Sequence, residues 1–115
     1  MCGRYTLAKP FKSIVTHFKA KTRQLDFKER FNIAPSQNVP TVVYDGQNRQ
    51  ISVLRWGLIP HWAKDDSIGM KTINARAETI SEKPSFRDSF KSKRCLVPAD
   101  GFIEWARNSK EKTPK

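Results

Sequence analysis

The sequence predicts one small domain that combines antiparallel strands with short helices. Three observations lead to this prediction. The chain has only 115 residues, an apolar stripe with helical spacing lies near its start, and two extended runs flank a turn in its middle. Because domains commonly hold about 100–200 residues, this length leaves no room for a second domain.

The first helix is predicted over Pro10–Lys21, after a strand-like stretch at Cys2–Leu7. Apolar residues recur in this helix at the i, i+3, i+4, i+7 positions of an amphipathic face: Phe11, Ile14, Val15 and Phe18. We therefore expect this face to pack on the core.

A β-hairpin is predicted next. Val39–Tyr44 and Ile51–Trp56 are rich in β-branched and aromatic residues, and Asp45-Gly46 supplies a turn between them. The expected loop, Asp45–Gln50, is longer than a two-residue turn, so the sequence leaves the register of the strands open.

The last third of the chain predicts a short helix and two strands. The helix is expected over Pro84–Phe90, with Pro84 in its first turn. The strands, Cys95–Val97 and Phe102–Trp105, are expected to be joined by a tight turn at Asp100-Gly101. Residues 106–115 contain four Lys or Arg residues and no large apolar side chain, so we expect a domain over 1–105 and an exposed basic tail.

The amino-acid composition limits the kinds of partner that the protein is expected to bind. The chain carries 22 Lys and Arg against 11 Asp and Glu, a formal charge of +11, which favours a polyanionic partner such as nucleic acid. A basic solubilising surface, a ribosome-type binder and a membrane-surface binder are the alternatives. No apolar stretch approaches the ~20 residues of a membrane span, and the N-terminus lacks the apolar core of a signal peptide, so a soluble, intracellular protein is expected.

Cysteine and histidine spacing argues against a disulfide framework and against a metal. Cys2 and Cys95 are far apart in the sequence and form no Cys-x-x-Cys pair. His17 and His61 share no metal-ligand spacing with them. We expect neither a metal nor another cofactor.

Cys2 is the most informative position for chemistry. Removal of Met1 would place a free α-amine, with a pKa of about 7.7–8.0, beside a thiol with a pKa of about 8.5. Such a 1,2-aminothiol suits an aldehyde, because the amine forms a Schiff base and the sulfur then closes a thiazolidine ring. The alternative is that Cys2 is an incidental small residue.

Two further polar positions have alternative interpretations. Asn74 could hold an amine or a carbonyl, with Arg76 gripping a phosphate, or Asn74 could be a helix N-cap with Glu78 in the first turn. Glu104 lies between Ile103 and Trp105, so it is either a half-buried general acid–base or an ordinary solvent-facing residue.

The segment Trp56–Trp62 is an apolar loop flanked by Arg55 and Lys64. Exposed aromatic rings beside basic groups form stacking platforms for unpaired bases. We expect Trp56 to belong to the core and Trp62 to reach a base.

The order of several motifs is more specific than any one of them. Six blocks follow one another along the chain: Met1–Tyr5, Phe31–Gln37, Trp56–Trp62, Ile73–Thr79, Ser85–Arg87 and Arg94–Trp105. In this order they resemble the SOS response-associated peptidase family, also called abasic-site processing proteins.

The resemblance implies an α+β fold of curved, mainly antiparallel, barrel-like sheets with short flanking helices and a basic groove for single-stranded DNA. It implies that Cys2 is the nucleophile that captures the aldehyde of an abasic site, that Asn74 orients its amine or the opened sugar, and that Glu104 shuttles protons. By the same resemblance, phosphates and the lesion would be contacted by Arg4, Arg76, Arg87 and Trp62. The partner is then abasic single-stranded DNA, with no membrane, and the location is the cytoplasm, at the nucleoid.

The family domain continues beyond this chain and supplies a catalytic histidine in a His-x-Arg-Met-Pro motif, so we expect an N-terminal portion of the domain. Uncovered sheet edges would then favour self-association. The family's peptidase label implies that Cys2 and Glu104 remove the preceding residue, here Met1. Two rival functions remain: a non-catalytic binding module for single-stranded nucleic acid, and a thiol peptidase that acts on other proteins.

Overall fold

The computed structural model describes residues 2–23 and 26–104; Trp105 and the predicted tail lie outside the described residues. Its elements, in chain order, are β1 (Tyr5–Leu7), α1 (Phe11–Phe18), β2 (Arg30–Ile33), β3 (Asn38–Tyr44), β4 (Arg49–Arg55), the 3₁₀ helix η1 (Ser67–Met70), α2 (Arg87–Ser92) and β5 (Gly101–Phe102). The strands form two antiparallel sheets, ordered β2-β1-β5 and β3-β4. This confirms the α+β fold class.

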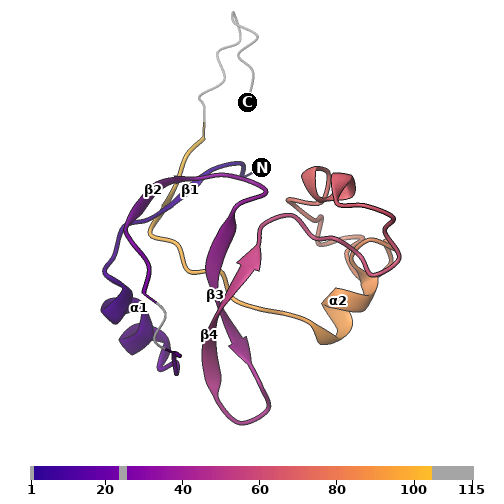
Figure 1. Ribbon diagram of the computed structural model, residues 1–115. Coiled ribbons are helices and arrows are strands. Elements are labelled where there is room, and N and C mark those ends of the chain that lie inside the picture. Colours follow the sequence, from indigo (N-terminus) through magenta and orange to yellow (C-terminus); the bar gives the residue numbers. More distant parts are fainter. Residues whose placement is uncertain (1, 24–25, 105–115) are drawn as a thin grey trace, which may run out of the picture.

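The β3–β4 hairpin runs through the middle of the molecule (Figure 1). The helix α1 and the β1–β2 pair lie on one side of it, and α2 with the loops that precede it lies on the other. The hairpin therefore joins the N-terminal sheet to the irregular second half of the described chain. Among residues 2–23 and 26–104, no helix is long and apolar enough to cross a lipid bilayer.

The predicted amphipathic helix is confirmed, although α1 is shorter than expected. It ends because Lys19 adopts a left-handed conformation (φ 50°), in which its amide donates to the carbonyl of Thr16. Ile14 is buried, and Phe11, Val15 and Phe18 pack against the same core. The apolar stripe thus faces inward, as its spacing predicts.

The predicted hairpin is also confirmed, and the structure fixes its register. Asn38 pairs with Arg55 at one end and Tyr44 pairs with Arg49 at the other. The loop is shorter than expected because the Asp45 carboxylate accepts hydrogen bonds from the Gln47 and Asn48 amides, at 2.8 and 2.7 Å. The strands can then continue almost to the turn.

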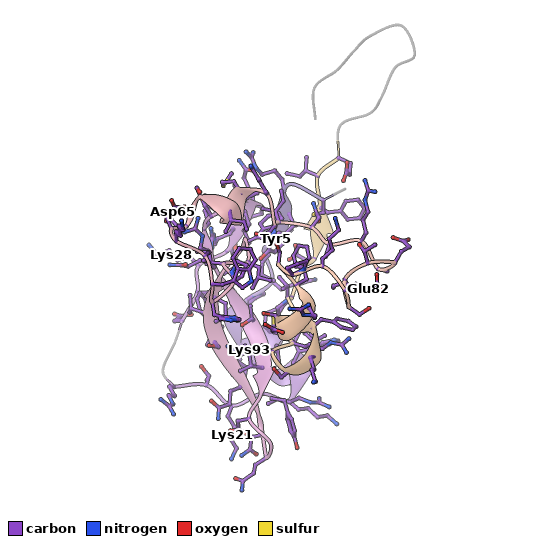
Figure 2. All side chains as sticks on the ribbon, turned by 90° about the vertical axis from the view of Figure 1, so that its right-hand side faces the viewer. Tyr5, Lys21, Lys28, Asp65, Glu82 and Lys93 are labelled. Carbon is purple, nitrogen blue, oxygen red and sulfur yellow. The ribbon has the colours of Figure 1, made fainter. Side chains whose placement is uncertain are left out.

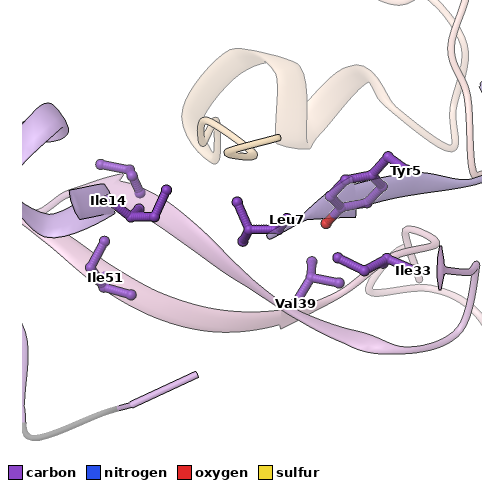
Figure 3. Close-up of a cluster of buried hydrophobic side chains, with 7 residues drawn as sticks. Tyr5, Leu7, Ile14, Ile33, Val39 and Ile51 are labelled. Carbon is purple, nitrogen blue, oxygen red and sulfur yellow. The ribbon is translucent and has the colours of Figure 1, made fainter. Parts of the chain in front are cut away.

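The core lies between the two sheets and α1. Its buried apolar residues are Tyr5, Leu7, Ile14, Ile33, Val39, Val42 and Ile51 (Figure 3). In β3 the four consecutive residues Val39–Val42 are all buried, so this strand is covered on both faces. The Thr41 hydroxyl tolerates this burial because it donates to the Ser52 carbonyl at 2.9 Å.

The predicted hairpin between Cys95–Val97 and Phe102–Trp105 is wrong. Leu96 exchanges backbone hydrogen bonds with Val42, at 2.8 and 2.9 Å, whereas β5 pairs with β1. The cause is Asp100, whose carboxylate accepts hydrogen bonds from the Thr6 hydroxyl and from the two amides that follow β1. These bonds tie the predicted turn to β1.

Two smaller expectations also differ from the structure. The helix α2 begins at Arg87, and Pro84 lies in the turn before it, where the Phe86 amide donates to the Lys83 carbonyl at 3.0 Å. Strand β2 was not predicted, because the alternating polar and apolar residues of Arg30–Ile33 form a run of only four residues. It is a strand because it pairs with β1.

Candidate functional site

A groove of about 1000 Å³ lies beside the hairpin, and all three predicted catalytic residues line it. Cys2 comes from the segment before β1, Asn74 from the loop after η1, and Glu104 from the segment after β5. Residues from the two ends and the middle of the chain are thus brought to one cavity.

Cys2 and Asn74 are in direct contact. The Asn74 Nδ2 atom donates a hydrogen bond of 2.8 Å to the backbone carbonyl oxygen of Cys2. Because that amide nitrogen is the donor, the Asn74 Oδ1 atom keeps its capacity to accept a hydrogen bond. The half-buried Cys2 thiol lies 3.6 Å from the carbonyl oxygen of Arg4. The N-cap interpretation of Asn74 is wrong, because no helix begins there.

A framework around Trp56 holds Asn74 in place. The Trp56 indole nitrogen donates to the carbonyl of Ile73, the residue before Asn74, at 2.9 Å. The Trp56 ring also meets the Tyr5 ring edge to face, with centroids 5.4 Å apart. Trp56 therefore connects β1, which follows Cys2, and the loop that carries Asn74 to the core, as expected of a core tryptophan.

Thr72 and Gly57 complete this framework, and neither was predicted from the sequence as a site residue. The Thr72 hydroxyl is buried and donates to the Leu58 carbonyl at 2.6 Å. Gly57 has a φ of +116°, and a Cβ atom there would lie 2.5 Å from the Gly69 carbonyl oxygen. The glycine directly after Trp56 was the available signal, since only glycine permits both this φ value and this close approach.

Glu104 is exposed at the rim of the groove, which agrees with the solvent-facing alternative. Its position is set by the backbone, because the Ile103 amide donates to the Arg4 carbonyl at 3.0 Å. The same Arg4 carbonyl lies beside the Cys2 thiol. One peptide group thus connects the Cys2 segment with the Glu104 segment.

None of the predicted DNA-binding residues lines this groove. Arg4 extends toward Asn32, with a distance of 3.5 Å between its Nη1 atom and Asn32 Oδ1. Arg87 lies 3.7 Å from the Asp88 carboxylate. Arg76 is exposed. Trp62 is 50% exposed and lines a separate cavity of about 210 Å³.

The groove is lined by equal numbers of positive and negative side chains and by an apolar wall. Its charged lining residues are Arg55, Lys93, Asp100 and Glu104. The Thr6 hydroxyl, followed by the Ala8 and Lys9 amides, lowers the pKa of Asp100. Three large apolar side chains of the groove are exposed: Leu54, Val97 and Phe102. The excess positive charge of the protein therefore lies mostly outside the groove.

Tyr5 forms part of the groove's inner wall. It is buried, and its hydroxyl group has no hydrogen-bond partner. Burial raises the pKa of Tyr5 to about 12, so the phenol stays protonated at physiological pH. Within residues 2–23 and 26–104, no three His, Cys, Asp or Glu side chains are grouped so as to hold a metal ion.

The whole chain, residues 1–115, matches the family model described as SOS response associated peptidase (SRAP). The chain is 52% identical over 117 residues to the abasic site processing protein YoqW of Bacillus subtilis, and 37% identical over 100 residues to the abasic site processing protein HMCES of Xenopus tropicalis. The chain therefore belongs to the SOS response associated peptidase family. These matches cover 99% and 76% of this chain.

A solved structure of a Bacteroides thetaiotaomicron protein has the same fold. It matches with a TM-score of 0.80 and 26% sequence identity over 96% of this chain. The chain spans about half the length of two of the relatives it matches, 52% of the Bacillus subtilis protein and 51% of the Bacteroides chain, and 30% of the Xenopus tropicalis protein.

Proposed function

We propose that this protein captures abasic sites in single-stranded DNA through Cys2, once Met1 has been removed. The observation that supports this most directly is the 2.8 Å hydrogen bond from Asn74 to the Cys2 carbonyl at the edge of a groove that Glu104 also lines. It holds residue 2 by its backbone, which leaves both its amine and its thiol to react. Relatives named abasic site processing proteins support the same substrate.

The reaction proceeds in two stages. The neutral α-amine of Cys2 adds to the aldehyde carbon of the ring-opened sugar, and the Glu104 carboxylate relays protons from the nitrogen to the oxygen that leaves as water when the Schiff base forms. The Cys2 sulfur then adds to the same carbon, and the thiol proton passes to the nitrogen as the thiazolidine ring closes. The net change is the loss of one water. Asn74 contributes by holding residue 2 and by offering Oδ1 to the amine N–H.

The DNA strand is held mainly by charge and stacking in this proposal. The net charge of +11 attracts the phosphate backbone, and Arg4, Arg76 and Arg87 are the candidate phosphate ligands. Trp62 offers an exposed ring near the lesion. The reactive unit is residues 1–105, and the protein acts on DNA at the nucleoid.

Intact mass spectrometry of the protein mixed with an abasic oligonucleotide tests this function. We expect a heat-stable adduct that is absent in Cys2→Ala and in Cys2→Ser. Cys95→Ala is the matched control, because Cys95 lines the same groove and should leave the yield unchanged. An unchanged adduct yield in Cys2→Ala would reject the proposal. Salt-sensitive binding without any adduct would instead identify a non-catalytic nucleic-acid module.

Peptidase activity is the second part of the proposal. The Cys2 thiol and Glu104 would remove Met1, the residue that blocks the amine. Protein made by cell-free translation without aminopeptidase should then lose Met1 with time, and Glu104→Gln should retain it. Cleavage of unrelated peptides in the absence of DNA would point to a general thiol peptidase.

A further inference from the structure

A second cavity, of about 210 Å³, lies between the Trp56–Trp62 loop and α2. Leu58 and Lys93 line both this cavity and the larger groove, so the two spaces adjoin. The function proposed above gives this cavity no role beyond the exposed ring of Trp62. Its volume suits one nucleobase.

One wall of the cavity is aromatic. The Trp62 ring is half exposed, and its indole nitrogen lies 3.4 Å from the Pro84 carbonyl oxygen, which limits rotation of the ring. A fixed, exposed indole offers a stacking face to any base, worth about 1–3 kcal/mol per base. Stacking alone does not distinguish one base from another.

The cavity lining also includes a hydrogen-bond acceptor, the Asp88 carboxylate. Asp88 Oδ2 lies 3.7 Å from His61 Nδ1, and Asp88 Oδ1 lies 3.7 Å from Arg87 Nε. Both distances exceed that of a normal hydrogen bond, so both oxygens keep their capacity to accept one. The neighbouring Arg87 guanidinium offsets part of the charge of the carboxylate, which reduces its repulsion of a DNA strand.

We propose that this cavity binds a guanine base of single-stranded DNA near the captured lesion, with Asp88 as the specificity-determining residue. The inference rests on the DNA partner of the proposed function. Guanine presents two adjacent donors, N1–H and the N2 amine, which match the two oxygens of one carboxylate. No other DNA base has two adjacent donors on that edge. The Lys93 ammonium, where the cavity meets the groove, is placed to contact the guanine's phosphate.

Non-covalent binding tests this proposal separately from capture. We suggest measuring, at one salt concentration, the fluorescence anisotropy of Cys2→Ala protein with oligo-dT that carries a single dG, deoxyinosine, dA or dC. The dG oligonucleotide should bind about five- to tenfold more tightly than the dA one, the low end for a bidentate contact. Deoxyinosine, which lacks the N2 amine, should fall between them.

The preference for dG should disappear in Asp88→Asn. Glu82→Gln removes one negative charge from an exposed residue outside the cavity, so it should leave the dG preference intact. Figure 2 shows Glu82 at the edge of the molecule, away from Lys93. Equal binding of the four oligonucleotides, or a preference that survives Asp88→Asn, would overturn the guanine site while leaving capture by Cys2 untouched. Failure to bind any of them would also overturn the guanine site, whereas the adduct with abasic DNA alone decides capture by Cys2.

Discussion

Replacing Gly57 with alanine should loosen the framework that holds Asn74, and the structure allows the effect to be divided into two parts. Gly57 and Gly46 both have positive φ values, +116° and +97°. A Cβ atom at Gly46 meets nothing within 4 Å, so Gly46→Ala carries only conformational strain, about 1–2 kcal/mol. Gly57→Ala carries the same strain and also places Cβ 2.5 Å from the Gly69 carbonyl oxygen.

The contact with Gly69 cannot be relieved by a side-chain movement, because the atom it meets is backbone. We therefore expect Gly57→Ala to lower the free energy of unfolding by about 3–5 kcal/mol, the upper range for single substitutions. A domain of this size has about 6–17 kcal/mol in total, at 0.05–0.15 kcal/mol per residue, so the variant should fold but weakly.

Urea denaturation of the two variants measures this difference. The midpoint for Gly57→Ala should lie well below that for Gly46→Ala, and the adduct with abasic DNA should form more slowly only in Gly57→Ala. Equal midpoints for the two variants would mean that the close approach of Cβ to the Gly69 carbonyl oxygen does not destabilise the fold, and would overturn this prediction.

Substitutions of Tyr5, Asn74 and Phe102, all of which line the groove, should have distinct effects. Tyr5→Phe should be neutral or stabilise the fold by up to about 1 kcal/mol, because it removes a buried hydroxyl without a partner. Folding raises the pKa of Tyr5 from 10.0 to about 12, so ionisation of this phenol favours unfolding as the pH rises from 10 to 12. Tyr5→Phe should therefore lose less stability over this pH range. Tyr44→Phe, at the exposed end of the hairpin, is the control in denaturation experiments at neutral and at high pH. Asn74→Ala should slow adduct formation about three- to tenfold, the worth of one hydrogen bond, whereas Asn32→Ala should have little effect on the rate. Phe102→Ser should lower the concentration-dependent mass in light scattering if the apolar wall mediates self-association, and an unchanged mass would exclude that surface.

The elements that could be predicted depend on local signals. The stripe in α1 and the turn at Asp45-Gly46 are encoded within a few residues of the structure they specify, and both predictions were correct. The segment after α2 was mispredicted because its partners are distant in the sequence. The groups that donate hydrogen bonds to Asp100 lie 91, 92 and 94 positions earlier in the sequence, and no local pattern encodes such a distant pairing.

The candidate site shows the same division. The exposure of Trp62, and the reactivity that we propose for Cys2, could be predicted from residue type and sequence neighbours. The contact between Asn74 and Cys2 spans 72 residues, and only the resemblance to a family placed the two residues in one site. Gly57 and Thr72 were missed because their role is to shape the backbone under Asn74, and this role requires the fold to be known.

The most direct test of Cys2 capture is to locate the bond in the purified adduct by digestion and tandem mass spectrometry, with and without borohydride. Capture by Cys2 should give one adduct on the N-terminal peptide that begins at Cys2, with a mass equal to protein plus DNA minus one water, and with the sugar carbon joined to both nitrogen and sulfur. Such a thiazolidine forms without a reductant. An adduct on a lysine, or one that survives only after borohydride reduction, would show that Cys2 does not capture the abasic site as a thiazolidine.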